Sequence, residues 1–172
     1  DVIQVGLLTG QLTAYGSPLS DDEFTTPMTK SEVEDVLIKI DTFYIEQPLG
    51  SGIQVAISDT VYISWRDVKQ YWVKEDWFFD KQRSVQDVRI IGICPLVENK
   101  DEFGNVRGLQ PLFWLYFPEC RPLFARASVF NRRNDKERRS LDDVFQKRMF
   151  SSYIIKESNV YDRYIADYKI GL

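Results

Sequence analysis

Residues 74–84 have the sequence KEDWFFDKQRS, and residues 112–121 have the sequence LFWLYFPECR. These two runs decide the fold, because each is a strand-length block of aromatic and β-branched residues. The first run leads into VRIIGI at 88–93, and the connection to the second contains DEFGN at 101–105, whose Gly and Asn suit a hairpin turn. We therefore expect an antiparallel sheet that builds surface and core rather than a reaction centre.

Helix signals flank this sheet. Capping-box patterns begin at Thr29, Ser64 and Ser140, and apolar stripes with helical spacing follow at 33–40 and 141–149. Other elements are expected as short helices at 1–8, 65–70 and 161–168, as strands at 12–15, 53–57, 61–63, 71–79, 88–96, 112–117 and 153–155, and as a loop at 16–27. The sequence thus predicts an α+β fold, with an antiparallel sheet of three or more strands and several short helices.

The composition indicates one folded unit. With 172 residues the chain is long enough for a core of its own, and we expect a single domain over residues 1–172. Hydrophobic residues make up 44% and aromatic residues 14%, whereas a disordered chain lacks the apolar surface that offsets the entropy of ordering. Aromatic residues at this density fill a core or crowd an interface.

Charge and hydropathy argue against several classes of partner. The chain has 22 basic and 26 acidic residues, for a net charge of -4, so no overall field draws a polyanion to it and we expect no nucleic acid. No run is long and apolar enough to span a bilayer, so we expect no direct membrane span.

The absence of histidine removes the commonest general base and the commonest transition-metal ligand. Two cysteines are too few for a zinc site built from Cys and His. Cys94 and Cys120 fall on the two predicted strands, where they are either two buried small hydrophobic residues or a disulfide. We favour the first, because both lie in apolar surroundings and disulfide geometry is demanding.

Three local patterns resemble functional motifs but have simpler explanations. The acidic cluster at 21–23 lacks the spacing of a calcium loop, so a solvated loop is favoured. Asp142 and Asp143 suit the first turn of a helix. Residues 50–55 carry two glycines of a dinucleotide fingerprint but precede a strand, so they predict a turn. We predict no catalytic residue, no cofactor and no metal site.

Candidate interface residues come from two places. The predicted strand at 71–79 carries aromatic and charged residues on both faces, so one face is expected to be only partly covered. The segment 131–139 mixes basic and acidic residues, and either contacts a partner or is a solvated loop. The candidates are Trp77, Phe78, Phe79, Arg83, Arg132, Arg133, Arg138 and Arg139.

The chain resembles the GldN/PorN family of gliding motility and type IX secretion proteins. Five blocks carry the resemblance in the same order, at 22–29 (DEFTTPMT), 74–96, 112–121, 129–135 (VFNRRND) and 140–168. Between Lys39 and Val68 the resemblance is weak.

The resemblance implies a non-enzymatic periplasmic scaffold protein associated with the outer membrane. Its partners would be an outer-membrane lipoprotein of the GldK/PorK type, with which it would form a ring, and the GldM/PorM shaft protein. The resemblance also implies that the chain is the C-terminal part of a longer secreted precursor.

Two hypotheses for the function follow. The first is this scaffold, which agrees with abundant aromatic residues and the lack of histidine. The second is a carboxylate-dependent hydrolase of cell-wall or surface glycans. It requires two carboxylates about 5 to 10 Å apart in a deep pocket.

Overall fold

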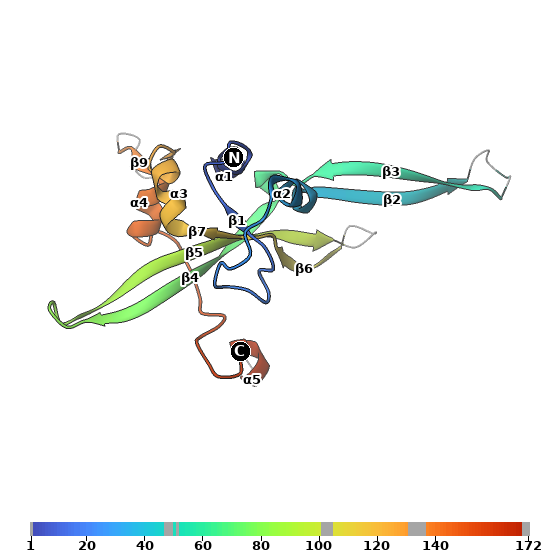
Figure 1. Cartoon of the computed structure of the whole chain (residues 1–172). Helices are drawn as coiled ribbons and strands as arrows, with labels where there is room; N and C mark the ends of the chain where they lie inside the picture. Colours follow the sequence, from blue (N-terminus) through green and yellow to red (C-terminus); the bar gives the residue numbers. More distant parts are fainter. Residues whose placement is uncertain (1, 47–49, 51, 101–104, 131–136, 170–172) are drawn as a thin grey trace. The chain divides into compact units, whose positions relative to one another are not determined.

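The structure is a computed structural model that describes residues 2–46, 50, 52–100, 105–130 and 137–169. The chain divides into two compact units, Asp1–Phe124 and Ala125–Leu172, and each is described by itself. Figure 1 shows the elements of both units. That the whole chain forms a single domain stays a prediction.

The first unit is built on a five-stranded antiparallel sheet with the order β1-β7-β5-β4, in which β6 also pairs with β5. The strands are β1 (Ala14–Tyr15), β4 (Val68–Asp80), β5 (Val85–Lys100), β6 (Val106–Pro111) and β7 (Trp114–Tyr116). The prediction of an α+β fold with an antiparallel sheet is therefore confirmed. The predicted hairpin turn at 101–105 lies mostly outside the described residues, but β5 and β6 on either side of it pair in antiparallel register.

Three α-helices accompany the sheet in the described part of this unit: α1 (Val2–Leu8), α2 (Lys30–Leu37) and α3 (Phe117–Phe124). The capping box at the start of α2 is confirmed, since the Thr29 hydroxyl accepts from the Glu32 N–H and the Glu32 carboxylate accepts from the Thr29 N–H. The largest fully buried side chains include Phe113, Phe117, Phe124, Ile93 and Leu115, which place the core between α3 and the centre of the sheet.

Helix α3 corrects the predicted strand at 112–117, because β7 is only three residues long and the helix begins at Phe117. Pro118 in the first turn favours a helix start, a signal that the aromatic run obscured. Cys120 therefore lies on a helix, while Cys94 lies on β5. Both are buried free thiols, as favoured from the sequence, and burial raises the pKa of each to about 12.

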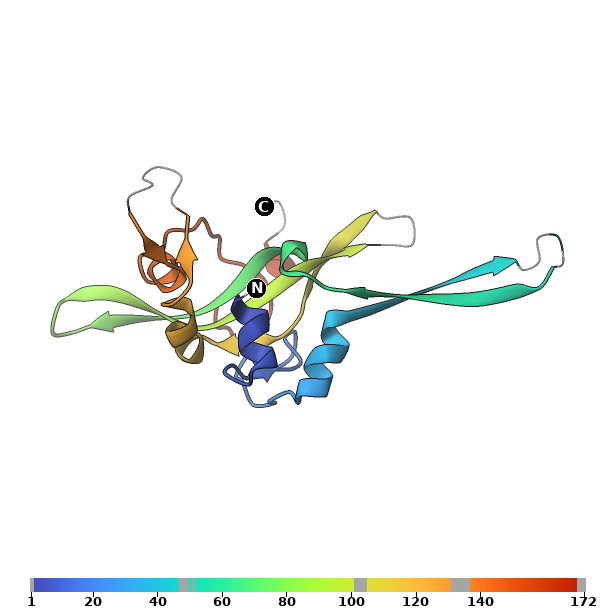
Figure 2. The same cartoon turned by 90° about the horizontal axis from the view of Figure 1, so that it is seen from above.

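A separate two-stranded ribbon corrects a second prediction. The apolar stripe at 33–40 predicted helix to its end, but α2 stops at Leu37 and β2 (Ile38–Glu46) follows directly. Its partner is β3 (Gln54–Tyr62), one continuous strand that contains most of both predicted strands, 53–57 and 61–63. The β-branched residues of β2 favour an extended strand, which explains why these residues pair with β3 although their apolar spacing suits a helix. The ribbon is drawn apart from the main sheet in Figure 2. Of the 50–55 turn, residue 51 lies outside the described part.

The predicted helix at 65–70 is a single 3₁₀ turn, η1 (Trp65–Asp67), after which β4 begins. The predicted helix at 1–8 is confirmed as α1, and Gly10 follows it with φ of 72° and donates its N–H to the Leu7 carbonyl.

The loop at 16–27 covers the middle of the sheet. Asp21 holds it together by accepting hydrogen bonds from the Glu23 and Thr25 N–H groups (3.0 and 3.2 Å) and from the Thr25 hydroxyl (2.5 Å). These bonds lower the pKa of Asp21, the Thr25 hydroxyl most of all. The acidic cluster thus has a structural role in the loop.

Phe24, at the tip of this loop, lies against Gly92 of β5. Edge-to-face contacts join its ring to Tyr15, Trp114 and Tyr116, with centroids 5.6 to 6.1 Å apart. A Cβ at Gly92 would lie 2.7 Å from Cε1 of that ring and nearer still to Cζ. Glycine is therefore required here by the close approach of the loop to the strand.

The second unit is smaller. Its described elements are β8 (Ser128–Val129), β9 (Arg139–Ser140), α4 (Leu141–Gln146) and α5 (Ile165–Tyr168). The capping box at Ser140 and Asp143 is confirmed, and the Ser140 hydroxyl contributes most to lowering the pKa of Asp143 to about 2. The predicted strand at 153–155 is wrong, since these residues form no ladder, and of the predicted helix at 161–168 only Ile165–Tyr168 is helical.

Candidate protein-docking surface

The two longest strands extend beyond the rest of the sheet as a hairpin arm. Residues 75–80 of β4 and 85–90 of β5 pair with one another, whereas β7 and β6 meet β5 only at 92–93 and at 96–100. Figure 1 shows the arm as the green two-stranded ribbon that ends at the turn after Asp80. In the described part of this unit no further strand covers its edges.

One face of the arm is apolar and uncovered. Trp77 pairs with Val88 and Phe79 pairs with Gln86, and residues directly opposite in an antiparallel ladder share a face. Trp77 is 56% exposed and Phe79 is 63% exposed. The Trp77 indole N–H donates to Glu75 on the same face (3.2 Å), so its polar atom already has an acceptor.

On the opposite face of the arm, the charged side chains interact with one another and with Phe78. Arg83, in the turn, donates from Nε to Asp80 and from a terminal nitrogen to Asp87, both at 2.8 Å. The Arg89 guanidinium lies 5.5 Å from the centre of the Phe78 ring, which is 38% exposed. This face therefore has few unsatisfied groups to offer a partner.

Hydrogen bonds on this charged face shift the pKa values of its carboxylates. The Arg83 side chain contributes most to lowering the pKa of Asp80, followed by the N–H groups of Arg83 and Gln82. For Asp87 the N–H of Val88 contributes most and Arg83 comes second. Both carboxylates therefore have a pKa below that of an ordinary aspartate.

Strand alternation in the sequence already placed Trp77 and Phe79 on one face and Phe78 on the other, but both faces carried aromatic and charged residues, so the sequence did not show which face is uncovered. The structure distinguishes them by the exposure of Trp77 and Phe79 on one face and by the charged contacts on the other. Trp77 and Phe79 are two residues apart on β4 and share one face, while Phe78 lies on the other face with Asp87 and Arg89; the irregularity at Lys74/Glu75 leaves Ile91 of β5 without a partner in the register. Of the four candidates on the arm, Trp77 and Phe79 form the uncovered apolar pair.

The basic candidates lie in the second unit. Arg138 is exposed, and Arg139 donates twice to Glu137, at 2.7 and 2.6 Å, which raises its pKa. Arg139 is thus engaged by its own neighbour rather than held open for an anion. Arg132 and Arg133 lie outside the described residues.

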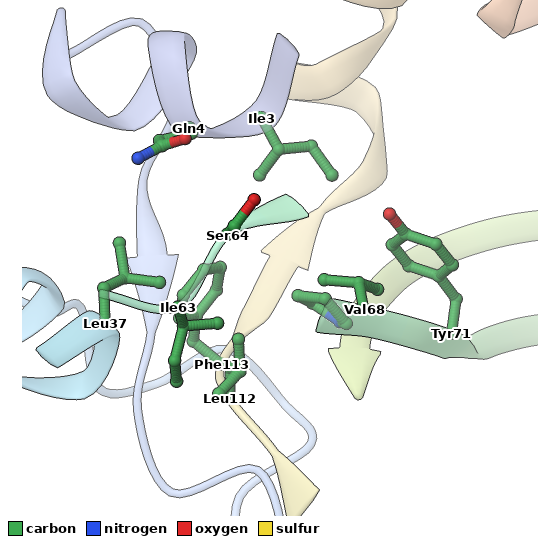
Figure 3. A pocket seen from close by; sticks show the side chains of 10 residues that line it. Ile3, Gln4, Leu37, Ile63, Ser64, Val68, Tyr71, Leu112 and Phe113 are labelled. Atoms are coloured by element: carbon green, nitrogen blue, oxygen red, sulfur yellow. The ribbon is translucent and has the colours of Figure 1, made fainter. Parts of the chain in front are cut away.

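The hydrolase hypothesis requires two carboxylates in a pocket, and the first unit has two surface hollows in which such a pair can be sought. The first has a volume of about 60 Å³ and lies between α1, the end of α2 and β4, as Figure 3 shows, and no carboxylate lines it. The second, between α1 and α2, is lined by one carboxylate, that of Glu34. Neither hollow contains the pair that glycoside hydrolysis needs. Among the residues described, no cluster of Cys, Asp or Glu is placed to hold a metal ion.

Comparison with known proteins assigns the family. The family model described as "Gliding motility associated protein GldN" matches residues 1–171. The chain belongs to the GldN family. Membership makes it a component of the gliding motility and type IX secretion machinery and confirms the resemblance seen in the sequence. No curated protein matches the chain.

The GldN family is a structural component of this machinery rather than an enzyme family. None of the helices in the described parts of the chain is both long and apolar enough to cross a membrane.

Proposed function

We propose that this GldN-family chain is a non-enzymatic scaffold subunit of the periplasm, associated with the outer membrane. It binds an outer-membrane lipoprotein of the GldK/PorK type, associates with copies of itself in a ring, and contacts the GldM/PorM shaft. The observation that carries the proposal is the uncovered apolar face of the hairpin arm.

The arm has the features of a docking element. Its exposed pair, Trp77 and Phe79, is of the aromatic type that supplies most of the binding energy at protein interfaces. The ion pairs of Arg83 on the opposite face tie the turn to both strands, so less conformational freedom is lost when the arm binds. An apolar face on a pre-ordered ribbon therefore supports a role in protein contact.

A hydrolase is the second hypothesis, and it has less support. It needs two convergent carboxylates in a deep pocket, and the two hollows supply none and one respectively. Two acidic residues of the arm, Asp80 and Asp87, are both bound to Arg83. Their roles in holding the hairpin account for them.

Co-assembly tests the scaffold proposal. The chain and the lipoprotein would be purified separately and mixed over a range of concentrations, and the mass of the particles measured by light scattering after size exclusion. We expect large particles in the mixture that neither protein forms alone. If no complex forms at any concentration, the lipoprotein is not the partner, and an assay for glycan binding and hydrolysis then tests the second hypothesis.

A further inference from the structure

Strand β4 forms one edge of the main sheet over its whole length. It stands last in the strand order β1-β7-β5-β4, and no other strand of the described residues pairs with its outer side. Figure 1 shows β4 running from the middle of the sheet to the end of the arm. The backbone N–H and C=O groups of a long edge strand can pair with a strand of another chain.

The regular part of β4 has Glu75 at its midpoint. The pairing with β5 is irregular between Val68 and Gln70, and the turn of the hairpin follows Asp80. Between these limits the side chains of residues 70–80 alternate without interruption, because the extra residue at the other irregularity, Ile91, belongs to β5. A two-fold axis through Glu75, perpendicular to the sheet, would therefore set residues 70–80 of two copies side by side in antiparallel orientation.

The side chains of this stretch are complementary to one another about that axis. Lys74 of each copy would be opposite Asp76 of the other, so opposite charges meet twice. The apolar pairs, each of which would also form twice, are Val73 with Trp77, Trp72 with Phe78 and Tyr71 with Phe79. Aromatic pairs, aromatic and β-branched pairs and opposite charges are the cross-strand pairs that stabilise antiparallel sheets.

Neighbouring registers lose most of this complementarity. An axis at Lys74 places Trp72 opposite Asp76, and an axis at Asp76 places Lys74 opposite Phe78. Each of these registers keeps one of the apolar combinations instead of three. All three registers set like charges against each other at the axis, so the flanking pairs decide between them. Charges within an edge strand oppose pairing with foreign strands, whereas here they match a second copy of the same strand.

The two charged side chains of the pair are accessible from the same face of β4. Lys74 Nζ donates to the Asp22 carbonyl oxygen at 2.6 Å and lies 3.3 Å from the Asp22 carboxylate, which holds it beside the 16–27 loop. An ammonium group has three N–H donors, so it can bind a further carboxylate. Asp76 is exposed. The Lys74 side chain is thus already ordered for an acidic group that arrives along the edge.

We infer that β4 of one copy pairs with β4 of a second copy, antiparallel and centred on Glu75, so that the main sheets of two copies join. Tyr71 and Val73 of the second copy would lie beside Phe79 and Trp77 on the apolar face of the arm, which stays open and becomes wider. The same surface serves both copies, so the contact is isologous and closes as a pair.

This inference deepens the self-association in the proposed scaffold function, and it rests on that function for its setting. It names the strand and the register through which copies meet. A ring would then be built from such pairs through a second contact, because an isologous contact alone does not extend beyond two copies.

Disulfide trapping tests the position of the axis. In the full chain carrying Glu75→Cys, the new thiol would face its own counterpart, with Cα atoms about 4.5–5.5 Å apart, a separation that a disulfide spans. We expect a cross-linked dimer under mild oxidation. Cys94 and Cys120 do not interfere, because both are buried.

The matched control is Gln70→Cys, an exposed position on the same strand. It leaves the apolar and charged pairs intact, and its counterpart in the second copy would be roughly 30 Å away, so it should remain monomeric in the same experiment. Equal cross-linking of the two variants, or none in either, overturns the inference.

The like charges at the axis give a second test. Glu75→Gln removes the repulsion between the two carboxylates and keeps an acceptor oxygen for the Trp77 indole N–H. The dimer should therefore tighten by about threefold, measured by sedimentation equilibrium. A dimer that is unchanged or weaker shows that Glu75 does not lie at the axis.

A charge exchange separates pairing from folding. Asp76→Lys sets Lys74 against a lysine, and Lys74→Asp sets Asp76 against an aspartate, so each variant alone should dimerise at least about tenfold more weakly than the unchanged chain. An equimolar mixture of the two restores both attractive pairs and should recover the original affinity to within about threefold. A mixture that associates no more tightly than the separate variants overturns the register.

The failures of the two proposals are distinguishable. If Glu75→Cys forms the dimer but no lipoprotein binds, the contact between copies stands and the partner assignment falls. If the lipoprotein binds and neither the cross-link nor the charge exchange behaves as expected, the scaffold proposal stands and the pairing of β4 is wrong.

Discussion

The strands β4 and β5 run through two regions of the first unit: in one, other segments bury the strands, and in the other, large side chains remain exposed. At Gly92–Val97 every residue of β5 is buried, with Phe24 lying against Gly92 and α3 nearby. At 75–90 the strands continue as the arm, and Trp77 and Phe79 remain exposed. Both regions carry large apolar side chains, but the arm also carries many charged residues, whereas residues 92–97 (GICPLV) carry none. The difference shows that covering segments make the core, and that the same strands expose apolar side chains where nothing in the described residues covers them.

The largest effect is expected from removing an aromatic ring in the covered region. Phe124→Ala should lower the free energy of unfolding by about 3–5 kcal/mol, because the side chain is fully buried. Phe79→Ala is the matched change on the arm and should cost no more than about 1 kcal/mol. Urea unfolding of both variants, followed by fluorescence, measures the difference. Equal losses would show that the arm is packed like the core.

A smaller effect is expected where the 16–27 loop meets the sheet. Gly92→Ala should destabilise by about 2 kcal/mol, since the new methyl group overlaps the Phe24 ring. Gly16→Ala is the control, because its added Cβ would be 3.4 Å from the nearest atom, in Met28, and should change stability by less than about 0.5 kcal/mol. If Gly92→Ala is also silent, the loop does not cover the sheet in solution.

The smallest effect concerns the charged face of the arm. Arg83→Gln should raise the pKa of Asp80 more than that of Asp87, because Arg83 is the leading cause only for Asp80. Titration of the carboxyl carbons by NMR measures both. Each folded-state pKa lies below its unfolded value of about 3.9. The hydrogen bonds from Arg83 to Asp80 and Asp87 therefore stabilise the arm above that pH. Their contribution to stability is lost as the pH falls through the lowered pKa values of the two carboxylates. Equal rises in both pKa values would contradict the assigned hydrogen bonds.

The sequence predicted the elements that depend on local chemistry. The capping boxes at Thr29 and Ser140 and the strands at 71–79 and 88–96 are all confirmed, because each signal acts within a few residues. It did not predict β2, since helical spacing and β-branched composition compete there and pairing with β3 decides.

The candidate site was predicted in part. Aromatic composition and strand alternation indicated the right strand and the pairing of Trp77 with Phe79 on one face, but which face stays uncovered depends on segments distant in the sequence that pack on the sheet. The loop at 157–163 was not predicted because the spacing of Tyr161, Tyr164 and Tyr168 indicated a helix, whereas the Asn159 amide bonds the backbone at both ends of the loop.

The most direct test of the account compares lipoprotein binding by variants of the two faces of the arm. Trp77→Ser/Phe79→Ser removes the apolar pair, and Phe78→Ser is the control on the charged face of the same strand. We predict that the double variant weakens the dissociation constant at least tenfold, as expected for aromatic anchors, while Phe78→Ser changes it less than about threefold. Circular dichroism melting would confirm that both variants fold. Equal affinities for all three proteins would contradict the claim that the uncovered apolar face is the docking surface.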